Sequence, residues 1–100
     1  MQIDFDPNLG HEQSGIRPAL VLSPKAYNSR AELAVVCPIT NQTKGYPFEV
    51  AIPAGLPVTG VVLADQIRCV DWVTRQMSFR AKCPPAVVGE VQAKIRVLIF

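Results

Sequence analysis

Short apolar runs separated by polar segments rich in proline and glycine dominate the chain as far as Lys82. Continuous apolar runs of strand length predict buried strands at residues 19–23, 33–38, 60–64 and 67–70. Alternation of apolar and polar side chains predicts further strands at residues 48–52 and Met77–Lys82. Residues 3–5 are typical of the end of another strand, because Asp6-Pro7-Asn8 is turn chemistry, and we expect this first strand to be shortened at the N-terminus.

The period of the pattern changes at Pro84-Pro85, where the start of a helix tolerates proline. Val88, Val91, Ile95 and Leu98 then recur at steps of three and four residues, which predicts an amphipathic C-terminal helix. We expect residues 24–30 to form a polar connection. Short strands closed by one helix predict a mainly β protein folded as a small, partly open barrel. Without an internal repeat or a break in composition, we expect a single domain over residues 1–100.

Composition adds few constraints to this picture. With 49% apolar and 18% charged residues, the chain is globular, and its net charge of +2 permits an anionic partner without requiring one. Cys37, Cys69 and Cys83 lie far apart and His11 is the single histidine, so we expect no structural zinc site and instead buried, reduced thiols. The start has no basic leader and no apolar run reaches membrane-spanning length, so we expect a cytoplasmic protein that does not enter a membrane.

The polar stretch from Gly10 to Pro18 carries the first candidate chemistry. We interpret it as a loop that brings His11, Glu12 and Arg17 together before a buried strand. A carboxylate, an imidazole and a guanidinium suffice for acid–base work on a phosphate. An ordinary solvated hairpin loop, in which Arg17 pairs with Glu12 on the surface, explains the same residues.

Arg17 precedes one predicted strand and Thr40 follows another. If these strands pair antiparallel, both side chains reach the same rim of the barrel. There the guanidinium and the hydroxyl would hold a phosphodiester while an adjacent 2′-hydroxyl attacks it without a metal ion. Arg17 would stabilise the developing charge, and Glu12 or His11 would accept the proton. Thr40 as a plain turn residue at the strand exit is the ordinary alternative.

Other polar and aromatic positions leave two interpretations open. Asp65-Gln66 interrupts an apolar run and either forms a turn within the barrel or contacts a substrate. Tyr46, Trp72 and Phe79 either stack on bases or pack in the core, and we expect core packing for at least two of them. A basic surface and ordinary solvated strand faces both account for the following cations: Lys44, Arg68, Arg75, Arg80 and Lys82.

An ordered set of motifs extends over nearly the whole chain. They are Asp4-Phe5-Asp6-Pro7, Gly10-His11-Glu12-Gln13, Arg17-Pro18, Val21-Leu22-Ser23-Pro24, Cys37-Pro38-Ile39-Thr40, Lys44-Gly45-Tyr46-Pro47-Phe48-Glu49-Val50 and the run from Gly60 to Gln66. In this order and spacing the chain resembles the MazF/PemK-type toxins of bacterial toxin–antitoxin systems. Members of that family are metal-independent, sequence-selective endoribonucleases that cleave mRNA.

The resemblance implies an SH3-like small β-barrel with short helices that acts as a homodimer. It implies cleavage of single-stranded mRNA by 2′-hydroxyl attack, and a cognate antitoxin whose acidic, disordered segment docks on the toxin. It places catalysis on Arg17 and Thr40, with Glu12 in support, and requires no metal or cofactor. The positions that it implies for RNA binding are His11, Gln13, Asn41, Gln42, Lys44, Asp65 and Gln66.

One position departs from the pattern of the family. Some relatives carry an arginine where this chain has Leu63, so Arg17 alone would stabilise the charge here. Two further functions stay open at this point. The same barrel serves toxins that poison DNA gyrase through protein–protein contact, and a catalytically silent barrel would act only through binding its partner. The combination of Arg17, Thr40 and Glu12 favours the nuclease, because a gyrase-binding protein has no use for it.

Overall fold

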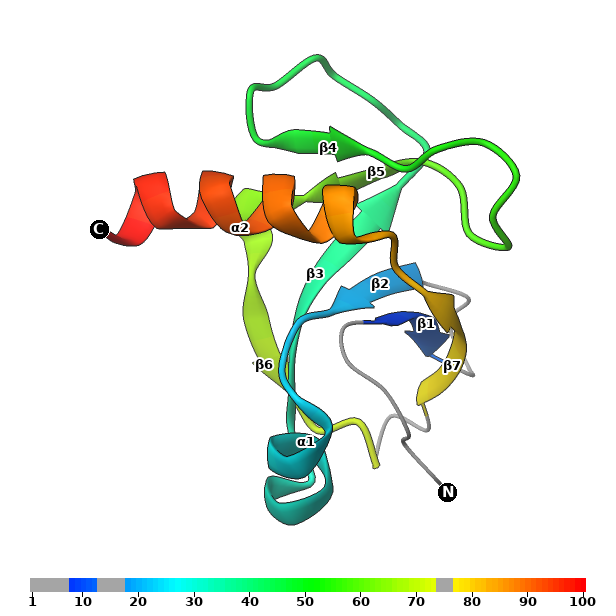
Figure 1. Cartoon of the computed structure of the whole chain (residues 1–100), viewed down its shortest axis with the longest axis vertical. Coiled ribbons are helices and arrows are strands. Elements are labelled where there is room, and N and C mark those ends of the chain that lie inside the picture. The colour runs from blue at the N-terminus through cyan, green and yellow to red at the C-terminus, as the bar shows by residue number, and fades with distance from the viewer. Residues whose placement is uncertain (1–7, 13–17, 74–76) are drawn as a thin grey trace.

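A computed structural model describes residues 8–12, 18–73 and 77–100, so the predicted strand at residues 3–5 lies outside it. Figure 1 shows a strongly curved sheet with one long helix lying across it. The elements in chain order are β1 (Asn8–Glu12), β2 (Pro18–Val21), α1 (Lys25–Ala31), β3 (Ala34–Thr40), β4 (Glu49–Ala51), β5 (Val61–Leu63), the 3-10 turn η1 (Ala64–Gln66), β6 (Arg68–Val70), β7 (Met77–Lys82) and α2 (Pro85–Ile99).

The seven strands form one antiparallel sheet in the order β4-β5-β3-β2-β1-β7, with β6 paired to β3 off this path. Strand β3 is central, because β2 pairs along one of its edges while β5 and β6 follow one another along the other edge. The turn η1 links these two short strands. Within the described residues β4 and β7 end the sheet without pairing to each other, so the barrel is partly open, as predicted.

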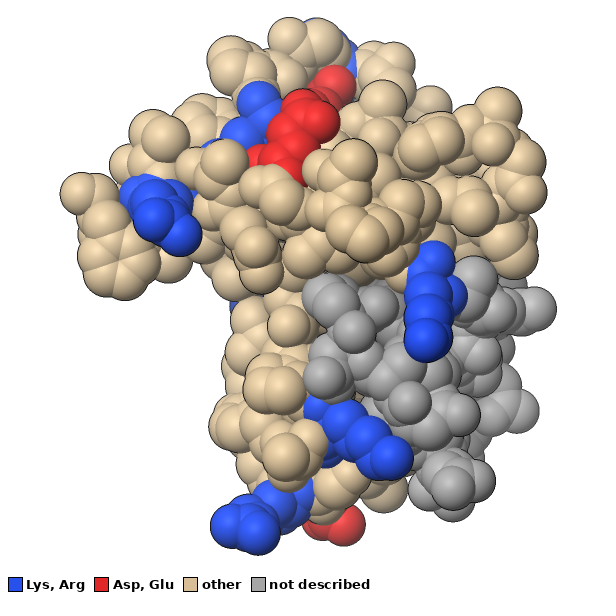
Figure 2. Space-filling model, viewed as in Figure 1, with Lys and Arg blue, Asp and Glu red and all other residues tan. Residues whose placement is uncertain are grey.

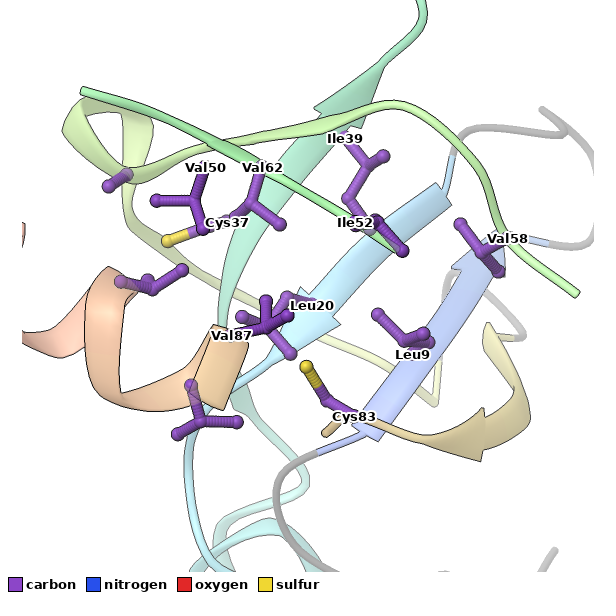
Figure 3. Close-up of a cluster of buried hydrophobic side chains, with 13 residues drawn as sticks. Leu9, Leu20, Cys37, Ile39, Val50, Ile52, Val58, Val62, Cys83 and Val87 are labelled. Atoms are coloured by element: carbon purple, nitrogen blue, oxygen red, sulfur yellow. The ribbon is translucent and has the colours of Figure 1, made fainter. Parts of the chain in front are cut away.

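Both faces of the central strands are buried. Leu20 and Cys37 face the main core, whereas their neighbours Val21 and Val36 belong to a second cluster with Trp72. Side chains alternate between the two faces of a strand, so burial on both sides produces the unbroken apolar runs in the sequence. Figure 3 shows the main core, in which side chains from the sheet and from α2 meet.

Helix α2 begins at Pro85, as the sequence predicts, and covers the main core. Val88 and Val91 are buried and Ile95 packs against the core, which confirms three of the four predicted contact positions. The prediction for Leu98 is wrong, since 49% of this residue is exposed. The cause is visible in Figure 1, where the end of α2 projects beyond the sheet.

Three predicted boundaries need correction. Residues 24–30, predicted as a polar connection, form most of α1, whose central Asn28 is fully buried. Strand β1 includes Gly10, His11 and Glu12, which we interpreted as loop, because it pairs with β2 on one edge and with β7 on the other. Strand β3 extends to Thr40, because pairing with β5 continues the ladder past the predicted end at residue 38.

A buried polar contact attaches α1 to the sheet. The Ser23 hydroxyl donates to Oδ1 of Asn28 at 2.5 Å, and Nδ2 of Asn28 donates to the Ser23 carbonyl oxygen at 3.1 Å. The indole of Trp72 donates to the Asn28 carbonyl oxygen at 2.9 Å, and the backbone N–H of Val35 donates to the Ser23 hydroxyl at 2.8 Å. Tertiary hydrogen bonds therefore stabilise a helix too short to be stable alone.

Replacing Asn28 by alanine tests this contact. The substitution leaves the buried Ser23 hydroxyl without its acceptor and the Ser23 carbonyl without its donor, so we expect the free energy of unfolding to fall by about 2–3 kcal/mol. Urea unfolding measures the change, with Ser29→Ala as the control, because Ser29 is the next residue of α1 and is exposed. Equal midpoints for the two variants would contradict the structural role of Asn28.

The cysteines differ in environment. Cys37 and Cys83 are buried and free, as predicted, whereas Cys69 is exposed and the prediction of burial is wrong for it. Burial, and to a smaller extent the charge of Asp65, raises the pKa of the Cys37 thiol to about 12. Burial raises the pKa of Cys83 to about 11, so both buried thiols stay protonated and unreactive at neutral pH.

Neither described helix is long and apolar enough to cross a membrane.

Candidate functional site

A pocket of about 580 Å³ lies where β2 begins and β3 ends. Pro18 lines it from the start of β2, Thr40 from the end of β3, and Leu63, Gln66 and Arg68 from the β5–β6 edge. The antiparallel pairing of β2 with β3 brings these two strand ends together. The geometry confirms that the start of β2 and the end of β3 share one rim of the barrel.

A second, smaller pocket of about 150 Å³ adjoins the first. It is lined by Gln42, Lys44, Tyr46 and Glu49, together with three residues that also line the larger pocket: Thr40, Leu63 and Gln66. These three residues therefore lie where a larger hollow meets a smaller one. A chain-like ligand that occupied both pockets would pass over Thr40.

The hydroxyl of Thr40 is held by its own loop. Its Oγ1 accepts a hydrogen bond from the backbone N–H of Gln42 at 3.0 Å. This contact occupies one acceptor position of the oxygen and leaves the hydroxyl hydrogen available to be donated to another group. Thr40 itself is anchored in the sheet by its pairing with Val61 of β5.

The chain turns sharply beside Thr40, and Gly60 makes the turn possible. Gly60 has a φ of +118°, and a Cβ at this position would lie 2.4 Å from the carbonyl oxygen of Thr40. The Oδ1 atom of Asn41 would lie 3.0 Å from the same Cβ, and it accepts a hydrogen bond from the Thr59 hydroxyl at 3.2 Å. The absence of a side chain at Gly60 thus permits its close approach to the end of β3.

Replacing Gly60 by alanine is expected to lower the free energy of unfolding by about 3 kcal/mol, because backbone strain and a clash with Thr40 act together. Gly55→Ala is the matched control. Gly55 also has a positive φ, +95°, but a Cβ there meets nothing within 4 Å. Thermal unfolding of the two variants separates the effects, and equal losses would show that the close approach to Thr40 has no cost.

The structure brings four of the predicted site residues together around these pockets: Thr40, Gln42, Lys44 and Gln66. Asn41 and Asp65 are exposed nearby but line neither pocket. His11 and Glu12 lie on β1, where His11 pairs with Pro18, and their side chains are outside the described structure. Gln13 and Arg17 lie outside the described residues altogether.

The aromatic and basic candidates separate into different roles. Trp72 is a core residue and does not stack on a ligand, while Tyr46 is 54% exposed and lines the smaller pocket. The Phe79 side chain lies outside the description. On the face shown in Figure 2, Lys and Arg side chains lie in separate groups without forming a continuous stripe. Among the side chains that the structure describes, no single broad basic surface is therefore visible on that face, and Arg75 and the side chain of Arg80 lie outside this description.

Sequence reasoning missed two pocket residues. The motifs included Glu49 but predicted no role for it. In the structure its carboxylate accepts hydrogen bonds from the backbone of the loop before β4. Arg68 was considered only as part of a basic surface, yet it lines the larger pocket. A carboxylate that follows a Lys-Gly pair by a few residues was the available signal for Glu49.

In the described part of the chain, no three His, Cys, Asp or Glu side chains lie together in a way that could hold a metal ion.

Comparison with known proteins identifies the family. A model of the family described as PemK-like, MazF-like toxin of type II toxin–antitoxin system matches residues 1–99. The chain belongs to this toxin family. The family predicted from the motifs is thereby confirmed.

Individual relatives of the toxin agree with this assignment. The chain is 44% identical over 97 residues to the endoribonuclease toxin MazF of Escherichia coli strain K12, and the match covers 97% of this chain and 86% of the relative. It is 34% identical over 101 residues to the endoribonuclease PemK of Escherichia coli, covering 97% and 76% of the two chains. The crystal structure of MazE-MazF (Form-III) from Deinococcus radiodurans superimposes with a TM-score of 0.92 at 45% identity, covering 98% of this chain and 97% of that chain.

Proposed function

We propose that the toxin is a metal-independent endoribonuclease that cleaves single-stranded mRNA and is neutralised by a cognate antitoxin. The observation that carries the proposal is the position of Thr40, between the two pockets and with its hydroxyl available as a donor. Relatives covered over most of their length are named endoribonucleases. The antitoxin follows from membership of a toxin–antitoxin family and from the MazE-MazF complex that the fold matches.

The proposed reaction uses a nucleophile that the RNA itself supplies. The 2′-hydroxyl oxygen attacks the adjacent phosphorus, the bond from phosphorus to the 5′-oxygen breaks, and the products are a 2′,3′-cyclic phosphate and a 5′-hydroxyl end. Thr40 donates to a non-bridging oxygen. Arg17 precedes Pro18, which lines the same pocket as Thr40, and its guanidinium would stabilise the charge on the phosphate.

Proton transfer falls to the residues of β1 in this proposal. Glu12 or His11 accepts the proton of the 2′-hydroxyl, and the departing 5′-oxygen takes a proton from the other of these two residues or from solvent water. Both residues lie at the end of β1 next to the start of β2, since His11 pairs with Pro18. The pairing supports a place for them near the rim that carries Thr40.

RNA binding is proposed for residues around the same rim. Gln42, Lys44 and Gln66 line the pockets directly, and Tyr46 offers an exposed ring on which a base can stack. The remaining proposed contacts come from the neighbouring loops and from β1: His11, Gln13, Asn41 and Asp65. Because single-stranded bases are recognised by loop shape and stacking, the same loops would select the sequence that is cut.

The proposal includes a homodimer in the cytoplasm. The last turn of α2 and the residue that follows it expose a run of apolar side chains that a second copy of the chain would cover: Val97, Leu98, Ile99 and Phe100. mRNA, the proposed substrate, is translated in the cytoplasm, and this is where the toxin would act.

Incubation of the toxin with a mixed-sequence RNA in EDTA tests the function. We expect cleavage that survives chelation and leaves 2′,3′-cyclic phosphate and 5′-hydroxyl ends, which sequencing of the fragments would map. RNA left intact, together with trapping of gyrase–DNA complexes, would replace the nuclease by a gyrase poison. RNA left intact without gyrase trapping would mean a catalytically silent barrel.

A further inference from the structure

Glu49, the first residue of β4, binds the loop that precedes it with both oxygens of its carboxylate. Oε2 accepts a hydrogen bond from the backbone N–H of Lys44 at 2.9 Å, and Oε1 accepts one from the backbone N–H of Gly45 at 3.0 Å. The backbone N–H of Glu49 in turn donates to the carbonyl oxygen of Tyr46 at 3.1 Å. One side chain thus closes the loop on itself.

The carboxylate holds the second half of the loop, whereas the bond from Gln42 to Thr40 and the bond from Thr59 to Asn41 hold its start. Residues 41–46 form neither helix nor strand, and all six are exposed. Gly45 has a φ of +78°, which presents its N–H beside that of Lys44. Two adjacent backbone N–H groups in such a turn make a concave site for an anion, and Glu49 fills it.

The backbone of Glu49 is held in the sheet. It pairs with Leu63 of β5, and the neighbouring N–H of Ala64 donates to the Phe48 carbonyl oxygen at 3.0 Å. Leu63 also lines both pockets. The carboxylate therefore fixes the loop that carries Gln42 and Lys44 relative to the sheet.

We propose that Glu49 is a positioning residue for RNA binding: it holds the backbone at Lys44 and Gly45 so that the loop forms one wall of the RNA site. This inference rests on the proposed function. Glu49 does not contact the reacting phosphate in this role. The backbone of Thr40 is anchored by its pairing with Val61 of β5, and its hydroxyl accepts the N–H of Gln42, which precedes the Lys44–Gly45 pair held by Glu49. We therefore expect loss of Glu49 to act mainly on binding rather than on the chemical step.

Charge alone predicts the opposite effect. A carboxylate beside a phosphate-binding site repels RNA, so its removal would tighten binding if Glu49 acted only through its charge. The positioning role predicts weaker binding in spite of the lost negative charge. The sign of the change in affinity thus separates the two explanations.

The test compares Glu49→Ala with Glu49→Gln and with the control Glu90→Ala. Glutamine keeps one carbonyl oxygen and can accept one of the two hydrogen bonds. Glu90 is an exposed carboxylate on α2, outside both pockets, so its loss changes the net charge equally. We expect the KM for a mixed-sequence RNA to rise about tenfold in Glu49→Ala, with a smaller rise in Glu49→Gln, and kcat to change by less than about twofold in both.

Two measurements do not require cleavage. Affinity for single-stranded DNA of the same mixed sequence, which lacks the 2′-hydroxyl, should fall in parallel with the rise in KM. Amide hydrogen exchange at Lys44 and Gly45 should speed up at least about tenfold in Glu49→Ala and stay unchanged in Glu90→Ala. General loss of folded protein would instead lower kcat at constant KM.

The outcomes distinguish this inference from the proposed function. A parent protein that fails to cleave RNA overturns the nuclease, while DNA affinity and exchange still decide the role of Glu49. Cleavage by the parent with unchanged KM in Glu49→Ala overturns the positioning role alone. Tighter binding of DNA by Glu49→Ala, or exchange at Lys44 and Gly45 equal to that of the parent, also overturns it.

Discussion

Replacing Arg17 by alanine is expected to lower the rate of RNA cleavage by on the order of 10³-fold, the upper end of the loss seen when one donor to a developing negative charge is removed. In the proposed mechanism Arg17 is the cation assigned to this charge, and Leu63 offers no second cation two positions before Asp65. Pentacoordinate phosphorus carries more negative charge than the phosphodiester, so the loss should appear mainly in kcat. Gel-based or fluorogenic single-turnover kinetics in EDTA would measure it.

Two further variants make the result specific. Arg17→Lys keeps the positive charge but loses the two-pronged geometry of the guanidinium, so it should recover only part of the rate. Arg30→Ala removes an exposed arginine of α1 that lines neither pocket and should cleave RNA like the parent. If Arg17→Ala retained the parental rate, the charge-stabilising role would have to move to another cation, with Arg68 of the larger pocket the first to examine.

Replacing Thr40 by valine is expected to reduce kcat by about 10²-fold, because the variant loses the hydrogen bond to the phosphate oxygen at the moment when charge develops. Valine has the same branched shape and suits a strand, so β3 should retain its pairing with β5. The KM should change little. Thr40→Ser keeps the hydroxyl and is expected to retain most of the activity.

The contact with Gln42 provides an internal check on this interpretation. The Oγ1 of Thr40 also accepts the backbone N–H of Gln42, so valine removes a loop contact as well as a catalytic donor. If Thr40→Val acts by loosening the loop, KM should rise, as expected for Glu49→Ala. If it acts by removing the hydrogen bond to the phosphate, kcat should fall. A Thr40→Val variant with unchanged kcat and raised KM would therefore reduce Thr40 to a residue that shapes the loop.

The sequence predicts an element correctly where interactions between residues close in the chain determine it, and fails where contacts with distant residues do. The alternation at residues 48–52 and the helical period after Pro84 are local, and β4 and α2 appear where these patterns predict them. Helix α1 was missed because two residues outside it, Ser23 and Trp72, stabilise it through hydrogen bonds to its buried Asn28. Pairing with β7, which follows β1 by more than sixty residues, likewise extends β1 into a stretch that resembled a loop.

The candidate site shows the same division. Motifs alone selected Thr40, Gln42, Lys44 and Gln66, and the fold gathers these four around the two pockets. Motifs did not reveal that Glu49 holds the loop, because the two backbone N–H groups that it binds face it only once the chain has turned at Gly45. They also gave no sign that Gly60 must lack a side chain to let Thr40 approach.

The sequence by itself determined the mainly β class, the C-terminal helix and the family, because periodicity and the order of motifs are properties of the chain. Only the tertiary structure decided that Pro18 and Thr40 share one pocket, that Asp65 and Asn41 lie outside it, and that the end of α2 extends past the core. These facts depend on strand register and on contacts between residues distant in sequence. Such contacts form only when the free energy of packing selects one arrangement among many that the local pattern permits.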